Sequence, residues 1–283
     1  MQKILFLLIW ISFSITISGQ SPNDLYLFAQ SQYNNKNYEI ALKEYQRYLY
    51  FSSKPEPEVL KAIADCYSNL ENYEKAADYY EKAFFSTSSD SFRLDVLFKK
   101  SECKIKTKEF GIALIDLLSY SDSIDNESLN KLNFYCAMCY FGMDNFLMAE
   151  DYFVKSLGPD HPTKALQIQQ IFENRKSFYS PNPMTAYILS GFVPGLGQFY
   201  SGDIKNGVNS MLLTTFLAGV GIRIAVYQTV TDAVFTILPW FQRYYMGGMV
   251  RAEAIAIDKR GRRRSATFNE IIEIIASVKE APR

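Results

Sequence analysis

Few residues in this chain have the types and the spacing that catalysis requires. Cys136 and Cys139 form a Cys-x-x-Cys pair, which suits a redox-active dithiol or half of a metal site. His161 is the only histidine, and it lies beside Pro162 with no recognisable nucleophile or carboxylate partner. The sequence contains no zinc-ligand spacing, no phosphate-binding Walker loop and no dinucleotide fingerprint. We therefore expect no catalytic residues, no cofactor and no metal.

An internal repeat explains the cysteines better than redox chemistry does. Between residues 25 and 162, an aromatic residue is followed three positions later by an alanine in four places. These alanines are Ala41, Ala76, Ala113 and Ala149, and they are separated by 35, 37 and 36 residues. Small residues recur twelve positions before them, at Ala29, Ala64, Ser101 and Ala137. Bulky residues follow four positions after them, at Tyr45, Tyr80, Leu117 and Phe153. Small residues let paired helices approach closely while bulky ones fill the groove to the next pair, so the pattern predicts stacked helix pairs.

Three of the four cysteines occupy one position of this repeat. Cys66, Cys103 and Cys139 each lie ten residues before a repeat alanine, where a small packed residue is needed. Cysteines one repeat apart are expected to be too distant for a disulfide, which requires Cα atoms closer than about 7 Å. We interpret the cysteines as packed small hydrophobic residues, with a disulfide as the alternative.

The repeat resembles the tetratricopeptide repeat, whose period is about 34 residues. The resemblance covers about half of the chain in four helix pairs and is strongest in the second, at Leu60, Ala64, Tyr67, Tyr73, Ala76, Tyr80 and Ala83. It implies a solenoid over residues 21–180, with a capping helix over about 163–178, that binds a protein or peptide partner through its extended surface. The third repeat departs from the pattern at Lys104 and Leu117.

The N-terminus predicts export. Residues 1–3 form a short region made basic by Lys3, residues 4–17 form an apolar core, and Ser18 and Gly19 are small, which is typical of a secretory signal peptide over residues 1–19. An uncleaved anchor helix is the alternative. The chain has 283 residues with a formal net charge of zero, and this balance gives no sign of a nucleic-acid-binding surface.

The C-terminal part predicts a membrane module over residues 184–258. Its apolar segments are 184–200, 208–227 and 230–250, and the first is either a short kinked span or a half-inserted helix. Residues 259–283 contain a basic cluster, which prefers the cytoplasm, and an amphipathic tail. If the repeats are exported, three spans place this cluster inside; two spans are the alternative. Arg243 is a possible intramembrane polar residue, or it extends to an interface beside Tyr244.

The first apolar segment carries the motif Pro-Gly-x-Gly-Gln-x-Tyr-x-Gly. Its residues, with one further glycine, are Pro194, Gly195, Gly197, Gln198, Tyr200, Gly202 and Gly207. Residues 184–258 thereby resemble a group of small, largely uncharacterised bacterial membrane modules that follow signal peptides and helical repeats. Some relatives are associated with the small membrane-insertion efficiency factor family, which implies a role in envelope biogenesis. Glycine in such a segment favours close helix packing.

These features together predict an all-α protein in which a tetratricopeptide solenoid precedes a small helical transmembrane domain. The leading functional hypothesis is a membrane-anchored scaffold of the bacterial envelope, with periplasmic repeats, an inner-membrane anchor and a cytoplasmic tail. Its partners would be a protein or peptide and the lipid bilayer, and not nucleic acid. The alternative is that the membrane module acts in membrane-protein insertion or lipid biogenesis, with the repeats as a regulatory domain.

Overall fold

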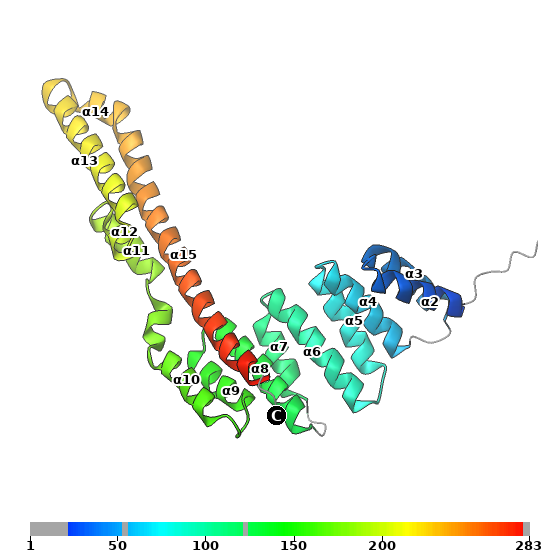
Figure 1. Cartoon of the computed structure of the whole chain (residues 1–283). Helices are drawn as coiled ribbons and strands as arrows, with labels where there is room; N and C mark the ends of the chain where they lie inside the picture. Colours follow the sequence, from blue (N-terminus) through cyan, green and yellow to red (C-terminus); the bar gives the residue numbers. More distant parts are fainter. Residues whose placement is uncertain (1–21, 53–55, 121–123, 280–283) are drawn as a thin grey trace, which may run out of the picture. The chain divides into compact units, whose positions relative to one another are not determined.

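The computed structural model describes residues 22–52, 56–120 and 124–279, and every regular element within these ranges is helical (Figure 1). The expected signal peptide over residues 1–19 lies outside the described residues. The chain divides into two compact units, one ending at Gly158 and the other beginning at Pro159. Each unit is described by itself.

The N-terminal unit consists of consecutive antiparallel helix pairs. The pairs are α2 (Pro22–Asn34) with α3 (Tyr38–Phe51), α4 (Pro57–Asn69) with α5 (Tyr73–Phe85), α6 (Asp90–Lys106) with α7 (Phe110–Leu118), and α8 (Asn126–Gly142) with α9 (Phe146–Ser156). Each helix packs against the helices before and after it in the sequence, as in a solenoid. The prediction of a tetratricopeptide-type solenoid is confirmed for this region.

The same tight turn joins the two helices of every pair. A non-glycine residue adopts a left-handed conformation, with φ between 59° and 64°, five residues before each repeat alanine: Lys36, Glu71, Lys108 and Asp144. The next residue donates its N–H to the carbonyl five residues earlier, as Asn72 does to Tyr67 at 2.9 Å. This is the Schellman pattern, which satisfies the last carbonyls of a helix. The donating residue is also the N-cap of the following helix, so one turn ends one helix and starts the next.

The repeat positions lie in the core of the unit. The side chains of Ala29, Ala64, Ser101, Ala137, Ala41, Ala76, Ala113 and Ala149 are fully buried, and so are those of Leu117 and Phe153. Tyr45 and Tyr80 are at most 3% exposed. The small residues leave space for helix crossings, and the large rings fill the volume between consecutive pairs.

The C-terminal unit begins with α10 (Pro162–Glu173) and the 3₁₀ helix η1 (Arg175–Tyr179), which both pack against the last helix of the chain. The sequence predicted that residues 163–178 would cap the repeats and that the repeat domain would extend to residue 180. The division after Gly158 differs from that boundary. α10 packs against the tail, where Ile271 and Ile275 are buried.

A long helical hairpin dominates this unit (Figure 1). Its limbs are α13 (Ile204–Tyr227) and α15 (Leu238–Lys279), and α14 (Val230–Thr236) connects them at the tip. The first part of the predicted third apolar segment forms α14, whereas the rest of it, the basic cluster and the tail as far as Lys279 form the single helix α15. Pro239 does not interrupt α15, since it lies in the first turn, where a helix needs no backbone N–H donor.

Candidate functional site

The Pro-Gly-x-Gly-Gln-x-Tyr motif forms a turn between two short helices. These are α11 (Pro183–Phe192) and α12 (Leu196–Tyr200). The N–H of Leu196 donates to the carbonyl of Val193 at 3.0 Å, and Gly195 between them has φ +92°. Proline at the second position and a left-handed glycine at the third define a type II turn. The expected first apolar segment is thus broken into two helices.

Gln198 is the polar centre of the motif and is fully buried. Its Oε1 accepts a hydrogen bond from Ser190 Oγ at 2.8 Å, and Ser190 Oγ in turn accepts from the N–H of Gly197 at 3.0 Å. Its Nε2 donates to the carbonyl of Gly248, fifty residues later, at 2.9 Å. Tyr245 also reaches across, donating its hydroxyl to the carbonyl of Gly191. These bonds join α11, α12 and α15.

The motif glycines allow backbones to meet. A Cβ atom on Gly197 would overlap the carbonyl oxygen of Ala186 on α11. A Cβ on Gly195 would overlap the carbonyl oxygen of Gly207 on α13, and one on Gly207 would lie 2.7 Å from the ring of Phe199. Such contacts are typical of helices that pack through small residues. The glycines therefore serve close packing and leave no cradle for a ligand.

The ends of the module lie side by side. The N–H of Asn182, just before α11, donates to the hydroxyl of Tyr200 at the end of α12 at 3.1 Å. Lys259 of α15 donates its Nζ to the carbonyl of Gly202 at 2.8 Å. Arg263 binds the carbonyls of Ser177 and Ser180 at 3.3 and 3.1 Å. Residues 177–182, 200–203 and 259–263 therefore form one end of the hairpin, which we call its base.

Asp203 begins α13 at this base. Its Oδ1 accepts from the N–H of Asn206 at 3.0 Å and its Oδ2 accepts from the Asn206 amide at 2.7 Å. These bonds lower the pKa of Asp203, and the nearby cations of Lys259 and Arg251 lower it further. The carboxylate is thus ionised at neutral pH, where it complements the positive end of the α13 dipole.

The structure places the remaining predicted residue, Arg243, on the exposed surface of α15. It lies near the start of that helix, toward the tip of the hairpin and away from Gln198. The sequence reasoning missed Ser190 and Tyr245 as partners of the motif. Ser190 carries a recognisable signal, since it is a hydroxyl in the apolar run 186–193 and precedes Gln198 by eight residues. The hydrogen bonds that connect the motif with α15 join residues about fifty positions apart, so the local sequence does not indicate them.

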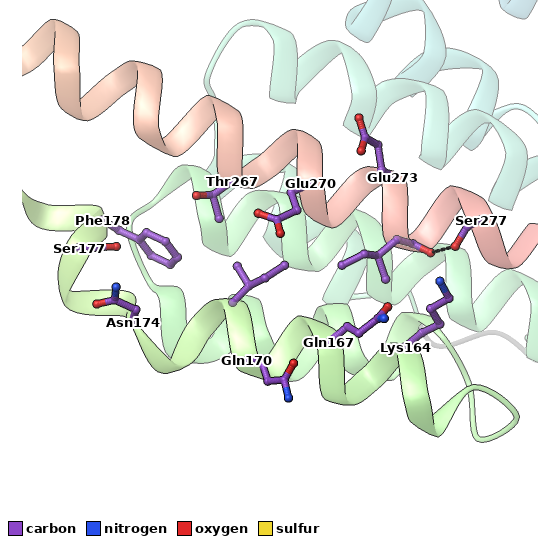
Figure 2. A pocket seen from close by; sticks show the side chains of 12 residues that line it. Lys164, Gln167, Gln170, Asn174, Ser177, Phe178, Thr267, Glu270, Glu273 and Ser277 are labelled. Carbon is purple, nitrogen blue, oxygen red and sulfur yellow. Dashed lines mark hydrogen bonds between the residues drawn. The ribbon is translucent and has the colours of Figure 1, made fainter.

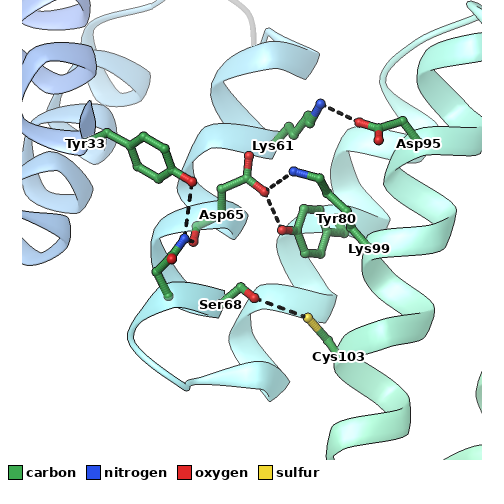
Figure 3. A network of polar contacts seen from close by, with 9 residues as sticks. Tyr33, Lys61, Asp65, Ser68, Tyr80, Asp95, Lys99 and Cys103 are labelled. Atoms are coloured by element: carbon green, nitrogen blue, oxygen red, sulfur yellow. Dashed lines mark hydrogen bonds and ion pairs between the residues drawn. The ribbon is translucent and has the colours of Figure 1, made fainter. Parts of the chain in front are cut away.

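In the N-terminal unit the main polar cluster surrounds Asp65 on α4 (Figure 3). Asp65 Oδ1 accepts from the Tyr80 hydroxyl at 2.5 Å and from Lys99 Nζ at 2.6 Å. One helical turn earlier, Lys61 pairs with Asp95 of α6. Burial and the adjoining Asp65 carboxylate raise the pKa of Tyr80, so its hydroxyl remains a donor. Carboxylates therefore already neutralise these two lysines across α4 and α6.

The cysteines lie in packed positions of the repeats. Cys66, Cys136 and Cys139 are fully buried and Cys103 is 2% exposed, and none forms a disulfide. Burial raises the pKa of Cys136 to about 12 and that of Cys139 to about 12, which suppresses the nucleophilic thiolate. No group of three or more His, Cys, Asp or Glu side chains in the described ranges is arranged to hold a metal.

A groove lies between α10 and the C-terminal part of α15 (Figure 2). Its volume is about 730 Å³, and its charged lining residues are Lys164, Glu270 and Glu273. Glutamines of α10 and the apolar side chains of Ile171, Ile274 and Phe178 complete the walls. The groove has neither a histidine nor a cysteine, and its arrangement resembles no known catalytic constellation.

The sequence of residues 10–83 matches the protein family described as anaphase-promoting complex, cyclosome, subunit 3. No curated protein matches the chain. The matched segment covers the first two helix pairs except for the last two residues of α5, and together with the packing of these pairs it establishes a tetratricopeptide-type repeat region in this protein. Repeats of this type are scaffolds for protein–protein interaction.

Proposed function

We propose that this protein is a non-enzymatic adaptor that binds a protein or peptide through its repeats and is held at a membrane by its C-terminal hairpin. The repeats support the binding role. The membrane role rests on α13, which in the described part of the chain is the helix long and apolar enough to cross a bilayer. Only 6% of its most apolar stretch is buried within the protein. A soluble protein would bury such a surface, whereas lipid covers it without cost.

The apolar surface continues around the hairpin. Its exposed large side chains include Leu212, Phe216, Ile222, Val226, Val234, Phe235, Trp240, Met246 and Val250. No Asp, Glu, Lys or Arg occurs between Gly207 and Ile222. At 1.5 Å per residue, α13 extends about 36 Å, compared with about 30 Å for the hydrocarbon core of a bilayer.

Substitution on α13 tests the anchor. We expect the double variant L212R/F216R to be released from membranes by alkaline carbonate, because each arginine at the centre of a spanning helix costs about 3 kcal/mol. Leu212 and Phe216 are both 65% exposed, so neither change disturbs the protein core. The matched control is I115R/L118R, two exposed apolar residues of α7, which should stay membrane-bound. If L212R/F216R also resists extraction, α13 is not the anchor.

The base of the hairpin also supports a revised topology. A span through residues 184–200 would separate Asn182 from Tyr200 by about 30 Å, whereas their hydrogen bond is 3.1 Å long. Two limbs, α13 and α15, then cross the bilayer while α11 and α12 remain at the base. Both ends of the module would share one face of the membrane. This arrangement disfavours the expected three spans, with periplasmic repeats and a cytoplasmic tail.

Reporter cysteines test this topology. In sealed vesicles we expect S180C and S265C to react with a membrane-impermeant maleimide from the same side, and Q228C at the tip to react from the other. All three positions are exposed, and the four native thiols are buried, so the background is low. Labelling of S180C and S265C from opposite sides would restore the model with three spans.

The alternative role, in which the module inserts membrane proteins or modifies lipid, has less support. The side chains of Gln198 and Ser190 form hydrogen bonds with other residues of the module, and Gly195 and Gly197 pack against backbone atoms of neighbouring helices. A bacterial envelope location, with the inner membrane as the site of anchoring, remains our proposal from the motif resemblance.

A further inference from the structure

The base of the hairpin points to a second membrane contact, and we propose that it is a docking surface for anionic phospholipid headgroups. The inference rests on the proposed anchor, because it concerns the level at which the hairpin leaves the bilayer. We call the surface the basic collar and define it by six exposed or partly exposed cations: Lys176, Lys205, Arg251, Lys259, Arg260 and Arg263.

Contacts within the C-terminal unit bring these cations together from three elements. Lys259 is fixed beside Gly202 by its hydrogen bond, next to the start of α13, where Lys205 lies. Arg263 is fixed on the carbonyls of η1, the element that contains Lys176. Arg251 lies on α15 eight residues, or about two helical turns, before Lys259, and its charge helps to lower the pKa of Asp203 at the same base. The collar is thus built by the fold and is not a run of neighbouring residues.

The charge at the base is strongly one-sided. Residues 175–182, 200–206 and 251–264 contain nine Lys and Arg but three Asp and Glu, a net charge of +6. One of those acids, Asp258, pairs with Arg262, and Asp203 caps α13. The tip, residues 223–243, contains two arginines and one aspartate. Positive charge that borders an apolar surface at one end is the pattern expected where a protein meets anionic lipid.

Aromatic side chains mark the same level. Tyr179 of η1 is 47% exposed and Tyr200 of α12 is 42% exposed, and both lie at the base. Tyrosine favours the boundary between hydrocarbon and headgroups, because its ring is apolar and its hydroxyl is polar. The tyrosines and the collar therefore lie together at the base, which is where a protein that enters a bilayer meets the interface and the headgroups.

Vesicle flotation tests the collar. The full chain, diluted from detergent, is mixed with vesicles of phosphatidylcholine alone or of phosphatidylcholine and phosphatidylglycerol in equal amounts. We expect a preference for the anionic vesicles that declines as salt is added. The triple variant K176Q/K205Q/R260Q removes three collar cations that make no hydrogen bond named above. Each cation near an anionic surface contributes about 1 kcal/mol, or roughly fivefold, so the preference should fall by about a hundredfold.

The matched control is K36Q/K43Q/K108Q, which removes three exposed lysines of the repeat unit and should keep the full preference. If the collar variant still prefers anionic vesicles as strongly as the wild type, or if the control loses the preference equally, the collar proposal is wrong. Flotation with both vesicle types but without preference overturns the collar and leaves the anchor intact. Failure to float with either type overturns the anchor itself, and the collar with it.

Discussion

Gly197→Ala should disrupt the packing of α11 against α12. The added methyl group would overlap the Ala186 carbonyl oxygen and would lie 2.5 Å from Ser190 Oγ, the atom that binds both Gln198 and the Gly197 N–H. A backbone carbonyl cannot rotate away as a side chain does, so α11 and α12 must separate. Overpacking of this kind costs about 3 kcal/mol or more. We expect amide hydrogen exchange in α11 and α12 of the full chain to accelerate by roughly a hundredfold.

Gly219→Ala is the control for that experiment. Gly219 lies within α13, and a Cβ atom placed there meets nothing within 4 Å. Because alanine has the higher helix propensity, the exchange rate of α13 should stay the same or decrease. Unchanged exchange in the Gly197→Ala variant would contradict the close packing of α11 on α12. Equal damage from both substitutions would indicate a general intolerance of alanine and not a specific contact.

Phe153→Ala should destabilise the fourth helix pair by about 3–5 kcal/mol, because it removes a fully buried aromatic ring from a packed core. The ring of Phe153 contacts those of Phe134 and Phe141 on α8, with centroid separations of 6.2 and 6.4 Å. The smaller side chain leaves a cavity that the rigid helix pair cannot close. Hydrogen exchange of α8 and α9 in the full chain measures the loss.

The control for this variant is Phe85→Ala, which truncates the same side chain where it is 75% exposed at the end of α5. Its effect should remain within about 0.5 kcal/mol. If the amides of α8 and α9 exchange as slowly in Phe153→Ala as in the wild type, the buried ring at this position of the repeat does not stabilise the helix pair.

The repeats were predictable because their signal is local and recurs. The spacing of Ala41, Ala76 and Ala113 sets the helix pairs, and the turns occur in the same register. The left-handed turn residues were not predictable by type, since Lys36, Glu71, Lys108 and Asp144 share no preference for that conformation. The helix pairing imposes it at a fixed position, and the Schellman hydrogen bonds compensate for the local cost.

The C-terminal unit was predicted less well, because its contacts connect distant parts of the chain. The sequence singled out Gln198 but offered nothing to link it with Gly248. From residue 238 onward, the third apolar segment, the basic cluster and the tail form one helix, because proline is compatible with a first helical turn and exposed arginines are compatible with any helix surface. Hydropathy alone therefore divides this part of the chain into separate segments, although the backbone forms one continuous helix through them.

The continuity of α15 gives it a mechanical role. From Lys259 to Lys279 the helix extends about 30 Å beyond the base, at 1.5 Å per residue. A rigid rod that shares its axis with a limb of the hairpin must follow every change in the tilt of that limb. Spanning helices are tilted by about 20° on average from the bilayer normal. A tilt of that size displaces the far end of such a rod by about 10 Å. If the proposed topology holds, a change in the tilt of this limb is transmitted along α15 to its C-terminal end.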